Sequence, residues 1–263
     1  MAPDHGCTIT LSDPRTDADE VVAERVAWAN AEQAVVLPDE TPTRVEDTIA
    51  RLRALPARLR QRLFSARDSS GALCGVAFTS VDPEEVDNPE LLWVNVQVGA
   101  DHRRRGLGRE LLTRLVDVAI EEGRSTIVGR TTGNVPAGEA FALEMGAEPK
   151  SRSHTNRLLV SKTDRAMLER WVADAATRSA DYELYGWDGP VADDDMEQWI
   201  KVILVMNTAP RDDLPLQDSP VTARDVRENE AMTMAGGMRT RSLIARQSSG
   251  ASRRWRVEAS NWS

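Results

Sequence analysis

The stretch LLWVNVQVGADHRRRGLGRELL at residues 91–112 joins a hydrophobic run to three consecutive arginines and two glycines. Leu91–Val98 is rich in apolar and β-branched residues, which predicts a strand. From residue 107 onward, apolar residues recur at helical spacing and Gly123 follows the last of them, which predicts an amphipathic helix with a glycine stop. The stripe of this helix consists of Leu107, Leu111, Leu115 and Val118.

The loop between this strand and this helix has the composition of an anion site. The first turn of a helix has free N–H groups, and the positive end of the helix dipole favours phosphate there. Glycines let the main chain approach a ligand closely, and arginines suit phosphate oxygens in charge and geometry. We therefore expect a pyrophosphate to bind this loop, at Arg103, Arg104, Arg105, Gly106, Leu107, Gly108 and Arg109.

Two common phosphate-binding motifs are excluded by the residues that follow the glycines. The Walker motif GxxxxGK[ST] requires a lysine that this loop does not have. A dinucleotide-binding GxGxxG motif requires a third glycine, but Leu111 stands at that position. A kinase or other nucleotide-binding protein remains an alternative, and it predicts that the protein binds ATP.

The composition sets limits on the class of protein. The chain has 263 residues, a formal net charge of −9 and a sequence pI near 5.0, which argues against a general nucleic-acid binder. The chain has no run of about 18 apolar residues, and its start, MAPDHGCT, does not have the pattern of a secretory signal, so we expect a cytoplasmic protein without a membrane span. Two cysteines and three histidines are too few for a disulfide framework or a zinc site, so we expect no metal.

The remaining periodicities predict a regular alternation of helices and strands around this loop. Helices are predicted over 15–33, over Arg44–Leu55 with Thr43 as a cap, from Asn134 or Gly138 to Gly146, and after the cap Thr163-Asp164; strands are predicted over Leu63–Arg67 and Leu73–Val81 as a hairpin, Ser125–Arg130, and Arg157–Ser161.

The pattern Arg103-x-x-Gly106-x-Gly108 directly after a hydrophobic strand resembles the acyl-CoA pyrophosphate loop of the GNAT N-acetyltransferase superfamily. The order of the predicted elements over residues 8–162 is similar to the GNAT order. The resemblance implies an α/β fold with a mixed, mostly antiparallel sheet. It also implies coenzyme contacts for Asn134, and Phe141 before Met145-Gly146 resembles a further segment of the superfamily.

The resemblance implies the chemistry as well. Acetyl-CoA would be the co-substrate, and the main chain of Val96 and Val98 would hold its pantetheine arm. An N–H near Val96 or Gln97 would polarise the thioester carbonyl. A primary amine of a small molecule or peptide would then attack directly, so the protein would mainly position the reactants and remove a proton. No nucleic acid and no membrane is implied as a partner.

The proton-transfer groups are less defined. Glu90 is the first candidate for the base, because it opens the strand on the parity of Leu92; Asp87 and Glu85 follow. Many relatives have a tyrosine acid where this chain has Ala142, so water, Tyr182 or Tyr185 would protonate the thiolate. The alternative is a degenerate acyl-CoA-binding or scaffold protein without turnover.

The last third of the chain repeats a short segment of the first. Residues 66–72 (ARDSSGA) and 245–251 (ARQSSGA) are similar, and helical patterns over 196–206 and 221–234 precede the second copy. A domain-sized repeat predicts duplication, as in tandem-domain GNAT proteins, although a chance match in Ser/Gly-rich turns is the alternative. We expect a connecting helix at 163–178 and a partial, truncated second GNAT-like segment at 179–263, cut short by truncation or by a lost reading frame near Gly250. Its open sheet edge predicts self-association.

Overall fold

The computed structural model describes residues 6–247, and they divide into two compact units. The first unit comprises the chain up to Glu148 together with Ala231–Met238. The second comprises Pro149–Glu230 and the described residues from Arg239 onward. We describe each unit by itself.

The first unit is built on a five-stranded sheet in the order β1-β2-β3-β4-β5. Every neighbouring pair is antiparallel except β4 and β5, which run parallel. The mixed, mostly antiparallel sheet expected from the sequence is therefore confirmed. The strands are β1 (Thr8–Ser12), β2 (Arg60–Arg67), β3 (Leu73–Val81), β4 (Leu91–Val98) and β5 (Thr126–Val128).

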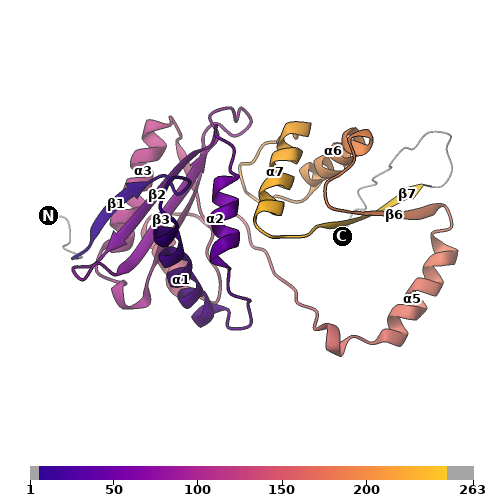
Figure 1. Ribbon diagram of the computed structural model, residues 1–263, viewed down its shortest axis with the longest axis horizontal. Helices are drawn as coiled ribbons and strands as arrows, with labels where there is room; N and C mark the ends of the chain where they lie inside the picture. The colour runs from indigo at the N-terminus through magenta and orange to yellow at the C-terminus, as the bar shows by residue number, and fades with distance from the viewer. Residues whose placement is uncertain (1–5, 248–263) are drawn as a thin grey trace. The chain divides into compact units, whose positions relative to one another are not determined.

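Helices cover both faces of this sheet (Figure 1). They are α1 (Asp19–Val36), α2 (Val45–Arg53), α3 (Leu107–Glu121) and α4 (Pro136–Glu144). A Cβ on Gly75 of β3 would lie 3.2 Å from Leu111 of α3, so α3 packs on that face of the sheet. Val98 of β4 is the partner of Gly75, so Gly99, directly after β4, faces the opposite side of the sheet. A Cβ on Gly99 would lie 3.4 Å from Glu32 of α1, which places α1 on that other face.

The main core lies between the sheet and α3. All members of the predicted stripe of α3 are at most 3% exposed, and they pack with Phe64, Ala66, Cys74, Ala77 and Leu92 of the strands. Burying such apolar side chains is the dominant stabilising contribution to a domain of this size. Helix α3, which begins within the loop at residues 103–109 (the arginine loop), is therefore fixed to the sheet along its length.

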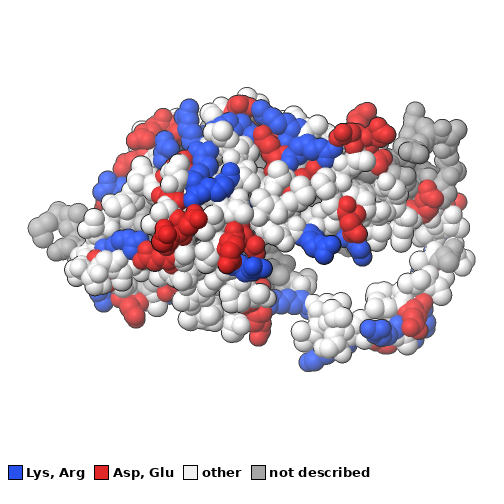
Figure 2. Space-filling view, viewed as in Figure 1, with Lys and Arg blue, Asp and Glu red and all other residues white. Residues whose placement is uncertain are grey.

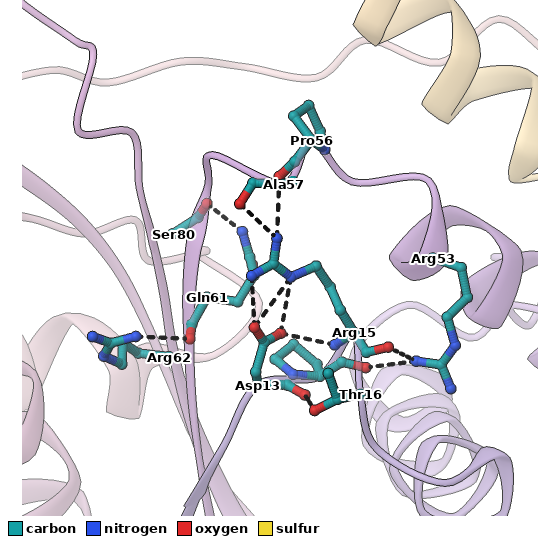
Figure 3. Close-up of polar contacts among 10 residues, drawn as sticks. Asp13, Arg15, Thr16, Arg53, Pro56, Ala57, Gln61, Arg62 and Ser80 are labelled. Atoms are coloured by element: carbon teal, nitrogen blue, oxygen red, sulfur yellow. Dashed lines mark hydrogen bonds and ion pairs between the residues drawn. The ribbon is translucent and has the colours of Figure 1, made fainter.

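An ion-pair network joins the end of β1 to the helices that follow it (Figure 3). Arg15 Nη2 lies 2.6 Å from Asp13 Oδ2, and Arg15 Nη1 donates to the carbonyl of Pro56 at 3.2 Å. Arg53 of α2 donates to the main-chain carbonyls of Pro14 and Arg15. One short loop is thus held to two segments that are distant in the sequence.

Two local expectations are wrong in detail. No side chain caps α2, and the main chain of Thr43 is instead bound by Asn30 of α1, with Thr43 N donating to Asn30 Oδ1 at 2.9 Å. Helix α4 begins neither at Asn134 nor at Gly138 but at Pro136, whose fixed φ suits a first helical position. The hairpin, β4 and the start of α3 are confirmed.

The strand expected at Arg157–Ser161 is also wrong. Its β-prone residues Leu158 and Leu159 are exposed, and only a 3₁₀ turn at Val160–Lys162 occurs there. β-Propensity expresses packing on a half-buried pleated surface, so it does not form a strand where no neighbouring strand pairs with it.

The second unit repeats the topology of the first half of the first unit. Its elements are α5 (Arg165–Arg178), capped by Asp164 as expected, β6 (Tyr182–Asp188), α6 (Met196–Leu204), α7 (Ala223–Ala235) and β7 (Arg241–Gln247), with 3₁₀ turns at Asp193–Asp195 and Val205–Thr208. The residues of α7 from Ala231 onward belong to the first unit. Strands β6 and β7 pair antiparallel around two helices, as β1 and β2 do. The repeated alanine is opposite an aliphatic residue in both units: Ala66 opposite Ile9, and Ala245 opposite Leu184.

A small separate core stabilises the second unit. Val191, Met196 and Val226 are buried, and Trp187 and Trp199 pack beside them with ring centroids 5.2 Å apart. The second half of the repeated heptapeptide, from Ser248 onward, lies outside the described residues. Within residues 6–247, no helix has the length and apolar character needed to cross a membrane.

Replacing Asp13 tests the β1 network. The hydrogen bond from Arg15 lowers the pKa of the Asp13 carboxyl, so the pair stabilises the fold at neutral pH, and this stability is lost as the pH falls through the lowered pKa. Asp13→Asn should lower the free energy of unfolding at pH 7 by about 1 kcal/mol, and the difference from wild type should shrink in acid. Urea denaturation against the exposed control Asp39→Asn measures it; a difference that is independent of pH would contradict this account.

Alkylation tests the character of Cys74. Its side chain is fully buried in β3, and burial, followed by the contact with Cys7, raises the pKa of its thiol to about 12. Thiolate is the reactive form, so at pH 8 we expect iodoacetamide to modify Cys7 and to spare Cys74 in the native protein. Mass spectrometry of peptides, with the urea-unfolded chain as the control, reads this out. Equal labelling of Cys74 in both states would contradict its place in the core.

Candidate active site

Strands β4 and β5 pair over only part of the length of β4. The parallel ladder runs from Leu91, opposite Thr126, to Trp93, opposite Val128, and stops there. The remaining residues of β4 still pair with β3 on their other side, up to Val98 opposite Gly75. One edge of β4 is therefore without a strand partner over residues 94–98, among the described residues, and a gap of this kind can admit an extended ligand.

The main-chain groups that face this open edge follow from the alternation of the antiparallel ladder. Gly99 N donates to Cys74 O at 2.9 Å, so Gly99 directs its main-chain groups toward β3. Residues of the same parity, including Gln97, do the same, whereas Val96 and Val98 direct theirs toward the open edge. Of these predicted contact residues, Val96 and Val98 thus have main-chain groups at the gap, and Gln97 does not.

The arginine loop lies at the end of β4 and turns sharply twice. Arg104 has φ 61° and Gly106 has φ 90°, both in the left-handed region. Glycine adopts this region at no steric cost, which explains Gly106 at the position before α3. Alternating left- and right-handed residues turn successive N–H groups toward one side, as in anion-binding nests.

The N–H groups of this loop have no internal acceptor. Arg103 N donates to Ala100 O and Glu110 N donates to Gly106 O. Between them, none of the main-chain N–H groups of residues 104–109 donates to a described residue. Donors of this kind need water or a ligand.

Gly108 allows two neighbouring elements to approach the start of α3. A Cβ at this position would lie 3.4 Å from Phe141 of α4 and 3.8 Å from Val98 of β4. Phe141 is half-buried there. The structure therefore brings Phe141, Gly108 and Val98 together, at the point where the open edge of β4 meets the loop.

The first arginine of the motif points back to the sheet. Arg103 Nε donates to Val98 O at 3.0 Å, and its guanidinium also lies 3.6 Å from Glu32 of α1. This arginine consequently ties the loop to the last residue of β4. Its side chain contributes to the shape of the loop in the structure.

The other basic residues of the loop lie further out. Arg104 and Arg109 both contact the carboxylate of Glu144, and His102 lies 3.7 Å from Asp68. Arg105 is exposed and forms no ion pair with the described part of the chain. On the face of the molecule seen in Figure 2, basic and acidic residues are interspersed.

Asn134 lies apart from the loop in its contacts. It is exposed, and its Nδ2 donates to Val36 O at the end of α1 at 3.2 Å. The amide thus fixes the segment between β5 and α4 to α1. Whether it also contacts a coenzyme stays a prediction.

The candidate bases lie at the opposite end of β4 from the loop. The main-chain carbonyl of Glu90 accepts hydrogen bonds from Ser125 N and Thr126 N, where β4 and β5 are paired. Val94, the first residue of β4 without a β5 partner, lies four positions after Glu90, about 13 Å further along the strand. Asp87 lies further back, in the acidic connector.

Sequence reasoning missed the residue that organises this connector. Arg124, whose side chain is only 7% exposed, donates to the carbonyls of Asn88 (3.0 Å), Leu91 (3.3 Å) and Asp82 (3.3 Å) and lies 3.5 Å from Glu85. Burial is the main cause that raises the pKa of Glu85, with Arg124 opposing it. An arginine after a helix-ending glycine gives no signal of such burial in the sequence.

Two further features bear on the chemistry. Ala142 lies in α4, and Tyr185 donates its hydroxyl to Asp195 inside the second unit at 3.2 Å. Across residues 6–247, no group of three or more His, Cys, Asp or Glu side chains is placed to hold a metal ion.

Comparison with solved structures finds a likeness in fold. A structure described as "Tandem GNAT protein from the clavulanic acid biosynthesis pathway (without AcCoA)" is 20% identical with a TM-score of 0.63, over 92% of this chain and 70% of that one. At this identity the likeness shows the fold alone.

Shorter structures match with lower TM-scores. A ribosomal-protein-alanine N-acetyltransferase from Brucella melitensis biovar Abortus 2308 is 19% identical with a TM-score of 0.41, over 58% of this chain and 99% of that one. A putative acetyl transferase from Pyrococcus furiosus is also 19% identical, with a TM-score of 0.43 and the same coverages. No curated protein matches the chain.

A family model described as "Acetyltransferase (GNAT) family" matches residues 26–147. This range contains the hairpin, the partly paired β4 and β5, the arginine loop and α3. Residues 26–147 are therefore a domain of the GNAT acetyltransferase family, in a chain whose fold is similar to that of a tandem GNAT protein.

Proposed function

We propose that the first unit transfers an acetyl group from acetyl-CoA to a primary amine of a small molecule or peptide. The observation that carries the proposal is the row of main-chain N–H groups at residues 104–109, which have no acceptor among the described residues and lie at the end of the half-open strand β4. A diphosphate would provide acceptors for these donors. The family of residues 26–147 supports the acetyl group as the group transferred.

In this proposal the coenzyme lies along the open edge of β4. Its diphosphate accepts hydrogen bonds from the loop, and Arg104, Arg105 and Arg109 add positive charge. Its pantetheine arm hydrogen-bonds the main chain of Val96 and Val98, in place of the missing strand. The arm would pass Phe141 where α4 meets Gly108.

Arg103 is then a positioning residue. Its guanidinium already holds the carbonyl of Val98 and faces Glu32. It therefore fixes the position of the loop relative to the end of β4, and the main-chain N–H groups that follow it are the donors. Arginine suits this task because its planar fork can hold two acceptors at once.

The amine attacks the thioester where β4 and β5 come together, near Trp93. The ammonium form must first lose a proton, since its pKa lies near 10. Glu90 is too far along the strand for direct contact with that point, so we propose that Glu90, Asp87 or Glu85 accepts the proton through water. Burial raises the pKa of the Glu85 carboxyl, and a raised pKa makes a carboxylate a stronger base at neutral pH.

The leaving thiolate would take its proton from water, because Ala142 provides no donor in α4. This absence favours a second candidate function, an acyl-CoA-binding or scaffold protein without turnover. The two candidates share the coenzyme site and differ in whether thiol is released.

Substitutions at Gly108 test the coenzyme site. Gly108→Asp should keep the fold, because a carboxylate in the first turn of α3 suits the helix dipole. It should weaken acetyl-CoA binding by roughly 100-fold or more, since two like charges in contact at a protein surface repel by a few kcal/mol. Isothermal titration measures the affinity.

Gly108→Ala is the matched control. Its Cβ would make ordinary contacts with Phe141 and Val98, so binding should stay within a few-fold of wild type. Unchanged affinity in Gly108→Asp would remove the loop from the coenzyme site.

A turnover assay separates the two candidate functions. With acetyl-CoA and a panel of small-molecule and peptide amines, we expect release of free thiol with at least one acceptor. Glu85→Gln should lower kcat at neutral pH more than Glu84→Gln, a substitution of the neighbouring exposed carboxylate. Coenzyme binding without thiol release from any acceptor would support the scaffold alternative.

A further inference from the structure

The carboxylate of Glu144 contacts two arginines of the arginine loop, Arg104 and Arg109. Glu144, the last residue of α4, lies with Oε2 3.3 Å from Arg104 Nη1 and with Oε1 3.4 Å from Arg109 Nη2. These arginines lie three residues before and two residues after the start of α3 at Leu107. Each oxygen of one anion thus meets a different guanidinium, on the two sides of the row of free N–H groups.

The carboxylate of Glu144 is placed as a small anion bound beside the loop would be. A carboxylate resembles a phosphate edge in having two oxygens that pair with guanidinium groups. The coenzyme proposed above would present its diphosphate to the same loop. Glu144 and the diphosphate therefore compete for Arg104 and Arg109, because both need the same donors.

The resident pairs are weak enough to be displaced. The side chains of Arg104, Arg109 and Glu144 are 81%, 56% and 49% exposed. Exposed pairs of this kind contribute little to stability, because water and salt screen them. A diphosphate carries more charge than one carboxylate and also satisfies the main-chain donors, which Glu144 does not contact in the structure.

The neighbouring basic residues also face carboxylates. Arg103 faces Glu32 of α1, and His102 faces Asp68 of the β2–β3 turn. Both carboxylates belong to segments outside the arginine loop. Without such partners the loop would hold several positive charges close together, and like charges repel.

We propose that Glu144 is a built-in counter-ion of the coenzyme site, which pairs with Arg104 and Arg109 when the site is empty and is displaced by the diphosphate. It holds the two guanidinium groups at the loop in the absence of coenzyme, and it lowers the affinity for the anion. This inference rests on the proposed function, which it extends to the control of affinity.

Glu144→Gln tests this proposal in the full-length chain. The substitution keeps the size of the side chain and removes its charge, so Arg104 and Arg109 become available to the ligand. We expect acetyl-CoA to bind about threefold to tenfold more tightly at low salt, and the gain to fade at high salt because ions screen the exposed charges. Isothermal titration at two salt concentrations measures both effects.

Glu121→Gln is the matched control. It changes the net charge equally but lies at the far end of α3, about 21 Å from Leu107 along the helix axis. We expect it to leave the affinity as in wild type. If both variants tighten binding equally, net charge alone explains the gain and the proposal is wrong; the same holds if Glu144→Gln leaves affinity unchanged while wild type binds acetyl-CoA.

Inorganic pyrophosphate is the second probe, and it separates this proposal from the proposed function. If acetyl-CoA does not bind but pyrophosphate binds more tightly to Glu144→Gln than to wild type, the counter-ion stands and the acetyl-CoA function falls. If neither probe binds any variant, both are overturned.

Discussion

The proposed function of the first unit depends on the main-chain N–H groups of residues 104–109, which have no acceptors among the described residues. Strand β4 ends at Val98, the chain turns through left-handed residues at Arg104 and Gly106, and α3 begins at Leu107. The buried stripe of α3 fixes the helix to the sheet. The donors are therefore held in place by the core and not by their own hydrogen bonds, which is the preorganisation that an anion site requires.

The same donors would allow an acidic chain to hold the proposed anion. Its basic side chains at the loop each have a carboxylate nearby, except Arg105, for which the described residues contain none. Main-chain N–H groups carry no net charge and cannot be neutralised in this way. The net charge of −9 thus has little influence on a site whose principal donors are dipoles, and long-range repulsion is screened by salt.

The sequence predicts this part of the fold well because local patterns determine it. Alternating and helical periodicities, with glycines at the turns, located the hairpin, β4 and α3. It could not predict Arg124, Glu32 or Glu144, because their roles arise from contacts between elements distant in the chain. The strand expected at 157–161 failed for the related reason that a strand needs a neighbour.

The repeat also explains why the proposed chemistry belongs to the first unit. In that unit Phe64 of β2 is 7% exposed because its face of the sheet packs against α3, the helix that begins at the loop. The corresponding residue of β7, 179 positions later, is Leu243, and it is 66% exposed. Leu184 on β6, opposite the repeated alanine, is 73% exposed on the same face. Within residues 149–247, then, the second unit has the strand pair and its two helices but no counterpart of β4, the loop or α3. In the first unit, the loop with the unpaired main-chain donors leads directly into α3, and α3 covers this face of the sheet. A unit without the loop and α3 therefore lacks both the donors and the cover.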